Sequence, residues 1–172
     1  IENGISYYAM HTNFDVLGMA DLSADYLELK DREILEVTYD REGRQEGLGR
    51  VGNLAEAQTL EAFGRFVKEK FQLPFVKVYG DLNKKVERVA VCTGSGKSLM
   101  PSVLHSQADV YVTADMDYHS SIDAVSQGIC VIDAGHYGTE YIFMDYMEEE
   151  LGQMLPELEV EKMRVQHPCK AI

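Results

Sequence analysis

The second half of the chain alternates short apolar runs with segments of helical periodicity, and this alternation restricts the possible folds more than any other feature. When a helix joins two strands it carries the chain back across the sheet, so the strands come to lie parallel. The sequence therefore predicts the α/β class, with mostly parallel or mixed sheets. The predicted elements are strands 76–79, 89–92, 110–113 and 129–132, helices 99–105 and 120–126, and a long helix from Tyr137 to about Leu155.

The first half is less regular. A charged turn with two glycines occupies residues 40–47, and Asn53 is a plausible N-cap for a helix from Leu54 to about Phe71. The other predicted elements are a strand at 5–10, a helix at 19–29, a strand at 34–39 and an edge strand at 159–165.

Charge and composition exclude several classes of partner. The chain has 16 basic against 29 acidic residues, a net charge of −13, whereas affinity for nucleic acid comes mostly from clustered Lys and Arg. No apolar run is long enough to span a bilayer, and the first residues do not resemble a signal segment. Cys92, Cys130 and Cys169 show no C-x-x-C spacing, which favours reduced thiols without disulfides. We expect a cytoplasmic protein with neither nucleic-acid nor membrane partners.

The segment VIDAGHYGTE, residues 131–140, follows a predicted strand with a sharp glycine turn and two ligand-type side chains. His136 and Glu140 are four residues apart at the start of a predicted helix, so both side chains leave the same face. This spacing suits chelation of a metal ion just beyond the carboxyl end of a strand, where open α/β sheets bind their ligands. The alternative is a surface His–Glu pair one helical turn apart.

HTNFD, residues 11–15, also follows a predicted strand. Its His11 and Asp15 could reach into the same cleft as His136 and Glu140, and both residue types bind divalent ions. The alternative is a turn in which Asp15 bonds to the backbone or caps a helix.

CTGSGKS, residues 92–98, resembles a Walker phosphate loop only in part, because the first glycine of that motif would stand where the chain has Val91. A local anion contact and a plain strand-to-helix turn are the remaining interpretations. TADMDYH, residues 113–119, offers Asp115, Asp117 and His119. The acids can be helix caps, and His119 either a solvated residue or a proton shuttle beside a metal cleft.

With these four motifs in order, the chain resembles the dinuclear-metal-centre family known as GTP cyclohydrolase I type 2 homologues. HTNFD and GHYGTE carry the resemblance most specifically. It implies two divalent ions, Zn, Fe or Mn, in the complete protein, with Asp15, His136 and Glu140 as ligands. The family also uses two adjacent histidines, which have no counterpart here and would lie upstream of Ile1. We therefore expect weak or partial metal binding by this chain.

The resemblance further implies a metal-dependent hydrolase. A metal-bound hydroxide would attack a nucleotide or related heterocycle, as in the opening of the guanine imidazole ring of GTP. His11 would orient Asp15 or relay a proton, and His119 would contact the substrate or leaving group. The alternatives are a non-catalytic metal-binding interaction or regulatory protein, and a P-loop nucleotide hydrolase.

The family's architecture supplies further expectations. It implies a toroidal homohexamer of subunits with two α/β subdomains. In this chain these would be residues 1–49 plus 116–172 and residues 50–115, with the metal site at the junction of the first and last parts of the chain.

Overall fold

In the computed structural model, which describes residues 2–170, the central strands are buried on both faces because their side chains alternate between two hydrophobic clusters. In β4 (Lys85–Ser95), Val89 and Val91 belong to one cluster and Ala90 to the other. The same alternation continues in β5 (Val110–Ala114) and β6 (Cys130–Asp133). Strands of this kind need cover on both sides, which confirms the predicted α/β class.

Within the described residues six strands form one mixed sheet in the order β1-β2-β4-β5-β6-β3. β4, β5 and β6 are parallel to one another, and the pairs β1–β2, β2–β4 and β3–β6 are antiparallel. The two edge strands are β1 (Lys30–Arg41) and β3 (Lys77–Tyr79). β2 (Arg44–Thr59) crosses residues 49–50, where the expected subdomains meet, and the sheet includes strands from both. The division into two subdomains stays a prediction.

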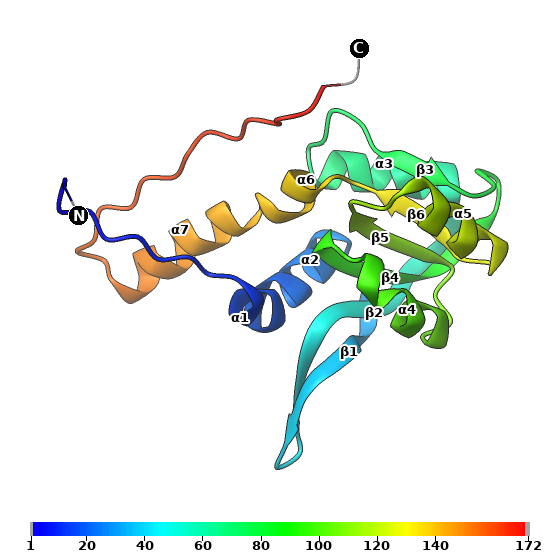
Figure 1. Cartoon of the computed structure of the whole chain (residues 1–172), viewed down its shortest axis with the longest axis horizontal. Helices are drawn as coiled ribbons and strands as arrows, with labels where there is room; N and C mark the ends of the chain where they lie inside the picture. Colours follow the sequence, from blue (N-terminus) through cyan, green and yellow to red (C-terminus); the bar gives the residue numbers. More distant parts are fainter. Residues whose placement is uncertain (1, 171–172) are drawn as a thin grey trace.

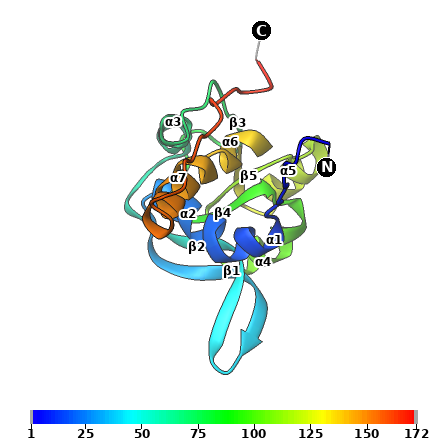
Figure 2. The same ribbon diagram turned by 90° about the vertical axis from the view of Figure 1, so that its left-hand side faces the viewer.

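Helices cover both faces of the sheet (Figures 1 and 2). One cluster contains buried residues of α2 (Ala20–Tyr26) and α3 (Leu60–Lys70) together with Tyr141 and Ile142, and the other contains residues of α4 (Met100–His105) and α5 (Tyr118–Ser126). No helix in residues 2–170 has the length and apolar character needed to cross a bilayer. The remaining helical elements are α1 (Thr12–Phe14), a wider π turn η1 (Asp15–Met19), a 3-10 turn η2 (Lys97–Leu99), α6 (His136–Glu140) and α7 (Phe143–Met154).

The first two strands form a hairpin that projects from the body of the molecule (Figure 1). Its turn consists of Glu42 and Gly43, both with positive φ, as tight two-residue hairpins require. The predicted turn at 40–47 was therefore too long, since residues 44–47 belong to β2.

Four other predicted elements differ from the structure. The helix expected from Leu54 begins only at Leu60, because residues 54–59 continue β2, in which Gln58 and Thr59 pair with β4, and Thr59 provides the N-cap. Residues 5–10 and 159–165 form no strand and pair with no neighbour in the described sheet. The long helix expected from Tyr137 is divided into α6 and α7 around the buried residues Tyr141 and Ile142.

The segment after α7 runs back alongside that helix (Figure 1). Lys162 forms ion pairs with Asp145 at 2.6 Å and Glu148 at 2.7 Å. Farther on, the backbone N–H of Gln166 donates a hydrogen bond to the Tyr137 hydroxyl, at 3.0 Å. These contacts bring the end of the described chain back to α6.

Candidate functional site

The carboxyl ends of β5 and β6 lie side by side, and the chain leaves them toward opposite faces of the sheet. Thr113 and Asp133 are partners in the parallel pairing. After β5 the chain enters α5, whose Ala124 packs in one cluster, whereas Tyr141, which follows α6, packs in the other. Adjacent parallel strands with diverging connections create a crevice at their carboxyl ends. Asp115 follows β5 and His136 begins α6, so both residues lie at this crevice.

A short contact joins the two residues. Nδ1 of His136 lies 2.6 Å from Oδ2 of Asp115. In the neutral ring, an Nδ1 proton donated to Asp115 leaves the Nε2 lone pair free for another partner. This hydrogen bond to Asp115 is also the main reason why the pKa of His136 is raised above its ordinary value. Asp115 has a φ of 55°, an uncommon conformation that Asp adopts more readily than most residues.

The opposite edge of the His136 ring, at Nε2, meets Glu140 and Gly94 near the end of β4. Nε2 of His136 lies 3.1 Å from Oε1 of Glu140. A Cβ atom at Gly94 would lie 2.4 Å from that Oε1 and 3.2 Å from Nε2, and Gly94 has a φ of +64°. Its N–H donates to Oγ1 of Thr139, at 3.0 Å. Glycine at this position thus allows both ligand-type atoms to converge above the turn.

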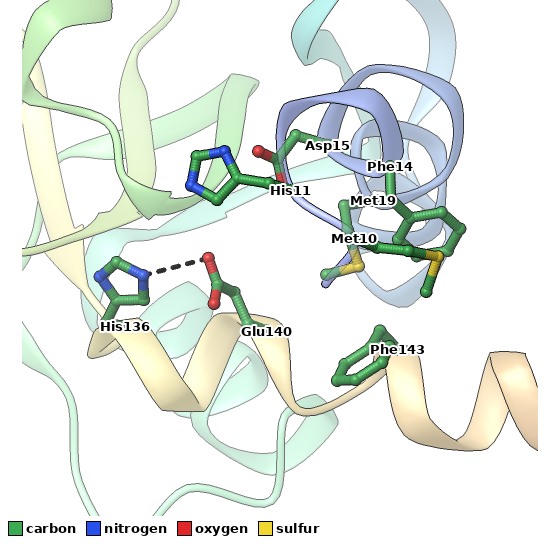
Figure 3. Close-up of a pocket in the computed structure, with 8 residues that line it drawn as sticks. All are labelled: Met10, His11, Phe14, Asp15, Met19, His136, Glu140 and Phe143. Atoms are coloured by element: carbon green, nitrogen blue, oxygen red, sulfur yellow. Dashed lines mark ion pairs between the residues drawn. The ribbon is translucent and has the colours of Figure 1, made fainter. Parts of the chain in front are cut away.

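A pocket of about 170 Å³ lies between these residues and the amino-terminal helical turns. His11 and Asp15 come from the α1–η1 segment on one side, and His136 and Glu140 from α6 on the other (Figure 3). Apolar side chains complete the lining: Met10, Phe14, Met19 and Phe143. The structure therefore brings the three ligands expected from the resemblance, together with His11, to one pocket.

Both pocket carboxylates take up protons more readily than usual. Burial raises the pKa of Asp15, and the nearby His11 and His136 partly oppose this. Burial likewise raises the pKa of Glu140, with His136 opposing and Asp15 adding to the rise. Two partly buried carboxylates facing one imidazole favour the binding of positive charge.

These residues match a divalent ion in donor type, with one imidazole nitrogen and two carboxylates. The space left by the absent side chain of Gly94 is where Nε2 of His136 and Oε1 of Glu140 converge. No group of three or more His, Cys, Asp or Glu side chains in residues 2–170 lies close enough to enclose a metal ion. Asp15, His136 and Glu140 thus have donor atoms that suit a divalent ion, but they form an open ligand set, which means that they do not enclose a metal position.

The TADMDYH and CTGSGKS segments contribute unequally to this site. Asp117 is the N-cap of α5, accepting the N–H of Ser120 at 2.9 Å, and it pairs with Lys97. His119 is exposed on α5, and its ring packs edge-on against that of the neighbouring Tyr118. It is not among the residues that line the 170 Å³ pocket. The lysine of the CTGSGKS segment is thus engaged by Asp117, and the segment's first glycine, Gly94, lies beneath Glu140 and His136.

Two features of this site were not predicted from the sequence. Asp115 was a possible helix cap, whereas in the structure it bonds to His136, and Gly94 had no specific role. The role of Asp115 could have been inferred from its position. It directly follows one buried strand, β5, and the neighbouring strand, β6, leads to His136. The thiol of Cys92 lies close enough to Asp15 and Glu140 to be influenced by their charges, but burial raises its pKa to about 12 and keeps it protonated at neutral pH.

Comparison with known proteins identifies relatives along nearly the whole chain. A family model described as Duf34/NIF3 (NGG1p interacting factor 3) matches residues 1–168. The GTP cyclohydrolase 1 type 2 homolog of Streptococcus pneumoniae is 35% identical over 159 residues, which are 89% of this chain and 58% of that protein. The protein of the same name from Lactococcus lactis is 37% identical over 153 residues, 86% of this chain and 56% of the relative. The chain thus spans little more than half the length of these relatives.

Solved structures share the fold. The crystal structure of a Bacillus cereus protein related to NIF3 matches with a TM-score of 0.89 and 22% identity, covering 99% of this chain and 74% of that one. Reduced HcgD from Methanocaldococcus jannaschii matches with a TM-score of 0.71 and 31% identity, covering 90% of this chain and 59% of the other.

Proposed function

The chain belongs to the Duf34/NIF3 family, and on that premise we propose that it is a divalent-metal-dependent hydrolase of a nucleotide or related heterocycle. The observation that carries the proposal is the convergence of Asp15, His136 and Glu140 on one pocket from opposite ends of the chain. The name of the curated relatives, GTP cyclohydrolase 1 type 2 homolog, supports a nucleotide as substrate.

Asp15, His136 and Glu140 would hold the metal, and Zn, Fe and Mn suit this mixture of imidazole and carboxylate better than Ca. When bound, such an ion lowers the pKa of a coordinated water and supplies a nucleophile at neutral pH. The protein's own part is to hold the ligands in place. Asp115 fixes the orientation of the His136 ring, and Thr139 and Gly94 fix the start of α6 against β4.

His11 would move a proton in the proposed reaction. It lines the same pocket as Asp15, and its Nδ1 lies 2.8 Å from the hydroxyl of Thr12, which leaves Nε2 for substrate or water. The apolar side of the pocket, formed by Phe14, Met19 and Phe143, would limit water around the reacting group.

The open ligand set supports weak metal binding by this chain. Three protein ligands shared between two cations leave much of each coordination sphere to water. We therefore expect one ion or none to be held tightly. Assembly as a homohexamer and a cytoplasmic location are further proposals that rest on the resemblance.

A second candidate function is non-catalytic. The same open ligand set, together with a family description that names an interacting factor, favours an interaction or regulatory protein that keeps a metal site. The two functions differ in one measurable property, which is metal-stimulated turnover.

The test measures release of formate from GTP, and turnover of a small panel of nucleotides, with and without Zn²⁺, Mn²⁺ or Fe²⁺. This chain and the full-length Streptococcus pneumoniae relative are assayed in parallel. Hydrolase function predicts metal-stimulated turnover that the Asp15→Ala variant abolishes and the Asp123→Ala variant, altered on α5 outside the pocket, retains. Intact metal binding without turnover in either protein would favour the interaction function.

A further inference from the structure

A second and larger cavity adjoins the candidate metal pocket. Its volume is about 440 Å³, within the range of cavities that enclose small molecules. Four segments form its walls: residues 73–77 before and at the start of β3, 115–117 after β5, 133–138 across the end of β6, and 167–169 near the end of the described chain. It therefore lies at the crevice where the connections of β5 and β6 diverge.

His136 lines both the cavity and the metal pocket. A molecule seated in the cavity would thus present one edge to the imidazole and, beyond it, to Glu140 and Asp15. Asp115, which holds the far side of the His136 ring, also lines the cavity. A substrate of the proposed hydrolase could occupy both spaces at once.

The charges in the cavity disfavour anions. Its lining contains the carboxylates of Asp115, Asp117 and Asp133 but a single ammonium group, that of Lys77. Lys77 is already paired with the buried Asp133, at 3.1 Å. Asp117 is likewise paired with Lys97, and Asp115 with His136. A polyphosphate would therefore find no unpaired ammonium group among the lining residues, whereas a neutral or cationic group with N–H donors could share the carboxylate oxygens.

Two carboxylates retain capacity to accept such donors. Oδ2 of Asp115 is bonded to His136, but its Oδ1 accepts no hydrogen bond from the residues that the structure describes. Asp117 accepts three hydrogen bonds, at Oδ1 from the N–H of Ser120 and at Oδ2 from the Ser120 hydroxyl and the Lys97 ammonium, and so has about one acceptor site left. An ionised carboxylate offers about four acceptor sites in all.

The remaining walls suit a flat ring. Phe75 and Tyr137 line the cavity, and the Tyr137 ring meets that of His167 edge-on, with centroids 5.6 Å apart. Leu73, Pro74 and Met116 add apolar surface. Aromatic walls beside acidic acceptors are the environment that a planar, nitrogen-rich heterocycle requires.

We propose that this cavity binds the heterocyclic base of the substrate, an amino-substituted ring whose N–H groups donate to Asp115 and Asp117, while the phosphates of a nucleotide stay outside. The proposal rests on the proposed function, because it assigns the substrate's base to the space beside His136. Guanosine, inosine and tripolyphosphate are suitable probes, since inosine lacks the 2-amino group and tripolyphosphate lacks the base.

Cys169 provides a local measure of occupancy. It lines the cavity and is exposed, whereas Cys92 and Cys130 are buried and serve as internal controls. In the chain kept metal-free with a chelator, the rate of maleimide labelling of Cys169 is followed by mass spectrometry. Guanosine at ten times its Kd should slow labelling about tenfold, because only the free protein reacts. Inosine should bind at least about tenfold more weakly, since it loses a donor to a charged acceptor. Tripolyphosphate should have no effect.

Protection by tripolyphosphate, or no protection by guanosine, would overturn the proposal. Tyr137→Leu should weaken guanosine binding about tenfold through loss of the aromatic wall. Its matched control is Tyr118→Leu, an exposed aromatic outside the cavity, which should bind guanosine normally. If Tyr137→Leu fails to fold, as judged by circular dichroism, the labelling experiment still decides the question.

The labelling experiment tests the placement of the base independently of the hydrolase assay. Labelling is measured without metal and without turnover. Protection of Cys169 in a protein that hydrolyses nothing would contradict only the proposed reaction, whereas turnover without protection would contradict only the placement of the base.

Discussion

Oδ2 of Asp115 lies 2.6 Å from Nδ1 of His136, although 21 positions separate the two residues in the sequence. Parallel pairing of β5 and β6 brings them together, since each follows the end of one strand. The contact orients the ring so that its other nitrogen faces Glu140, and several measurable properties depend on it.

Replacing Asp115 with Asn should lower the pKa of His136 toward the ordinary 6.5, because the hydrogen bond to Asp115 is the largest cause of its raised pKa. Asn tolerates the positive φ at this position. NMR titration of the metal-free chain measures the change directly. Asp117→Asn, which keeps an N-cap residue on α5, is the control and should leave the pKa of His136 unchanged.

The contact between Asp115 and His136 should stabilise the folded chain more at low pH than at high pH. A histidine whose pKa is raised by folding contributes stability that is complete below the unfolded value of 6.5 and is lost as the pH rises through the folded value. Asp115→Asn should therefore be less stable than the parent at about pH 6 and equally stable at about pH 9. The difference should be below about 1 kcal/mol, since both side chains are half exposed. Urea unfolding at the two pH values measures it, and a larger loss at the higher pH would contradict the assignment.

Gly94→Ala should weaken metal binding sharply. The new Cβ would meet Oε1 of Glu140 at 2.4 Å and Nε2 of His136 at 3.2 Å, and the φ of +64° adds about 1 kcal/mol of strain. Calorimetric titration with Zn²⁺ measures the affinity. Gly152→Ala on α7, where a Cβ would meet nothing within 4 Å, is the matched control and should preserve binding while stabilising the chain by up to about 1 kcal/mol. Undiminished affinity in Gly94→Ala would mean that the ion binds elsewhere.

Asp15→Ala should reduce metal affinity while leaving the fold intact, because Asp15 is only half buried and lies at the pocket edge. Elemental analysis should find at most one ion per chain in the parent and less in the variant. Asp123→Ala, also a loss of one carboxylate but on α5 outside the pocket, should match the parent. Full occupancy by two ions in this chain would refute the expectation of weak binding.

Asp21→Ala should cost about 1–3 kcal/mol of stability, because it leaves the buried guanidinium of Arg50 without its charged partner. Arg50 donates to both carboxylate oxygens of Asp21, at 2.7 and 2.9 Å, and so joins α2 to β2. The control is Glu61→Ala, which removes an exposed pair with Arg65 on α3 and should cost less than about 0.5 kcal/mol. Denaturant unfolding of both variants compares them, and equal losses would show that burial of Arg50 has little effect.

The sequence allowed prediction of the parallel part of the sheet and of the pocket, for related physical reasons. Strands buried on both faces appear as continuous apolar runs such as 110–113, and the polar residues directly after them fall at one edge of the sheet. This is why His136 and Glu140 could be named as candidate ligands. Asp15 was named from the HTNFD motif, although no strand precedes it in the structure. The role of all three in binding metal stays a prediction. The placement of His119 near the substrate also stays a prediction.

The failures occurred where distant contacts outweighed local preference. Residues 54–58 have helical composition but belong to β2, which returns to regular pairing with β4 at Gln58, and no local signal distinguishes the two outcomes. The strand expected at 5–10 satisfied the local pattern without a partner to pair with. Asp115 appeared to be an ordinary cap, because its contact with His136 depends on the pairing of two separate strands.

β2 has two neighbours, pairing with β1 between Arg44 and Asn53 and with β4 between Arg50 and Thr59. The projecting hairpin is therefore continuous, through β2, with the centre of the sheet. Because Arg50 pairs with Val91 in antiparallel register, the base of the hairpin lies beside the end of β4 that carries Gly94. Loss of this pairing would thus remove support from the strand end beneath the candidate metal pocket.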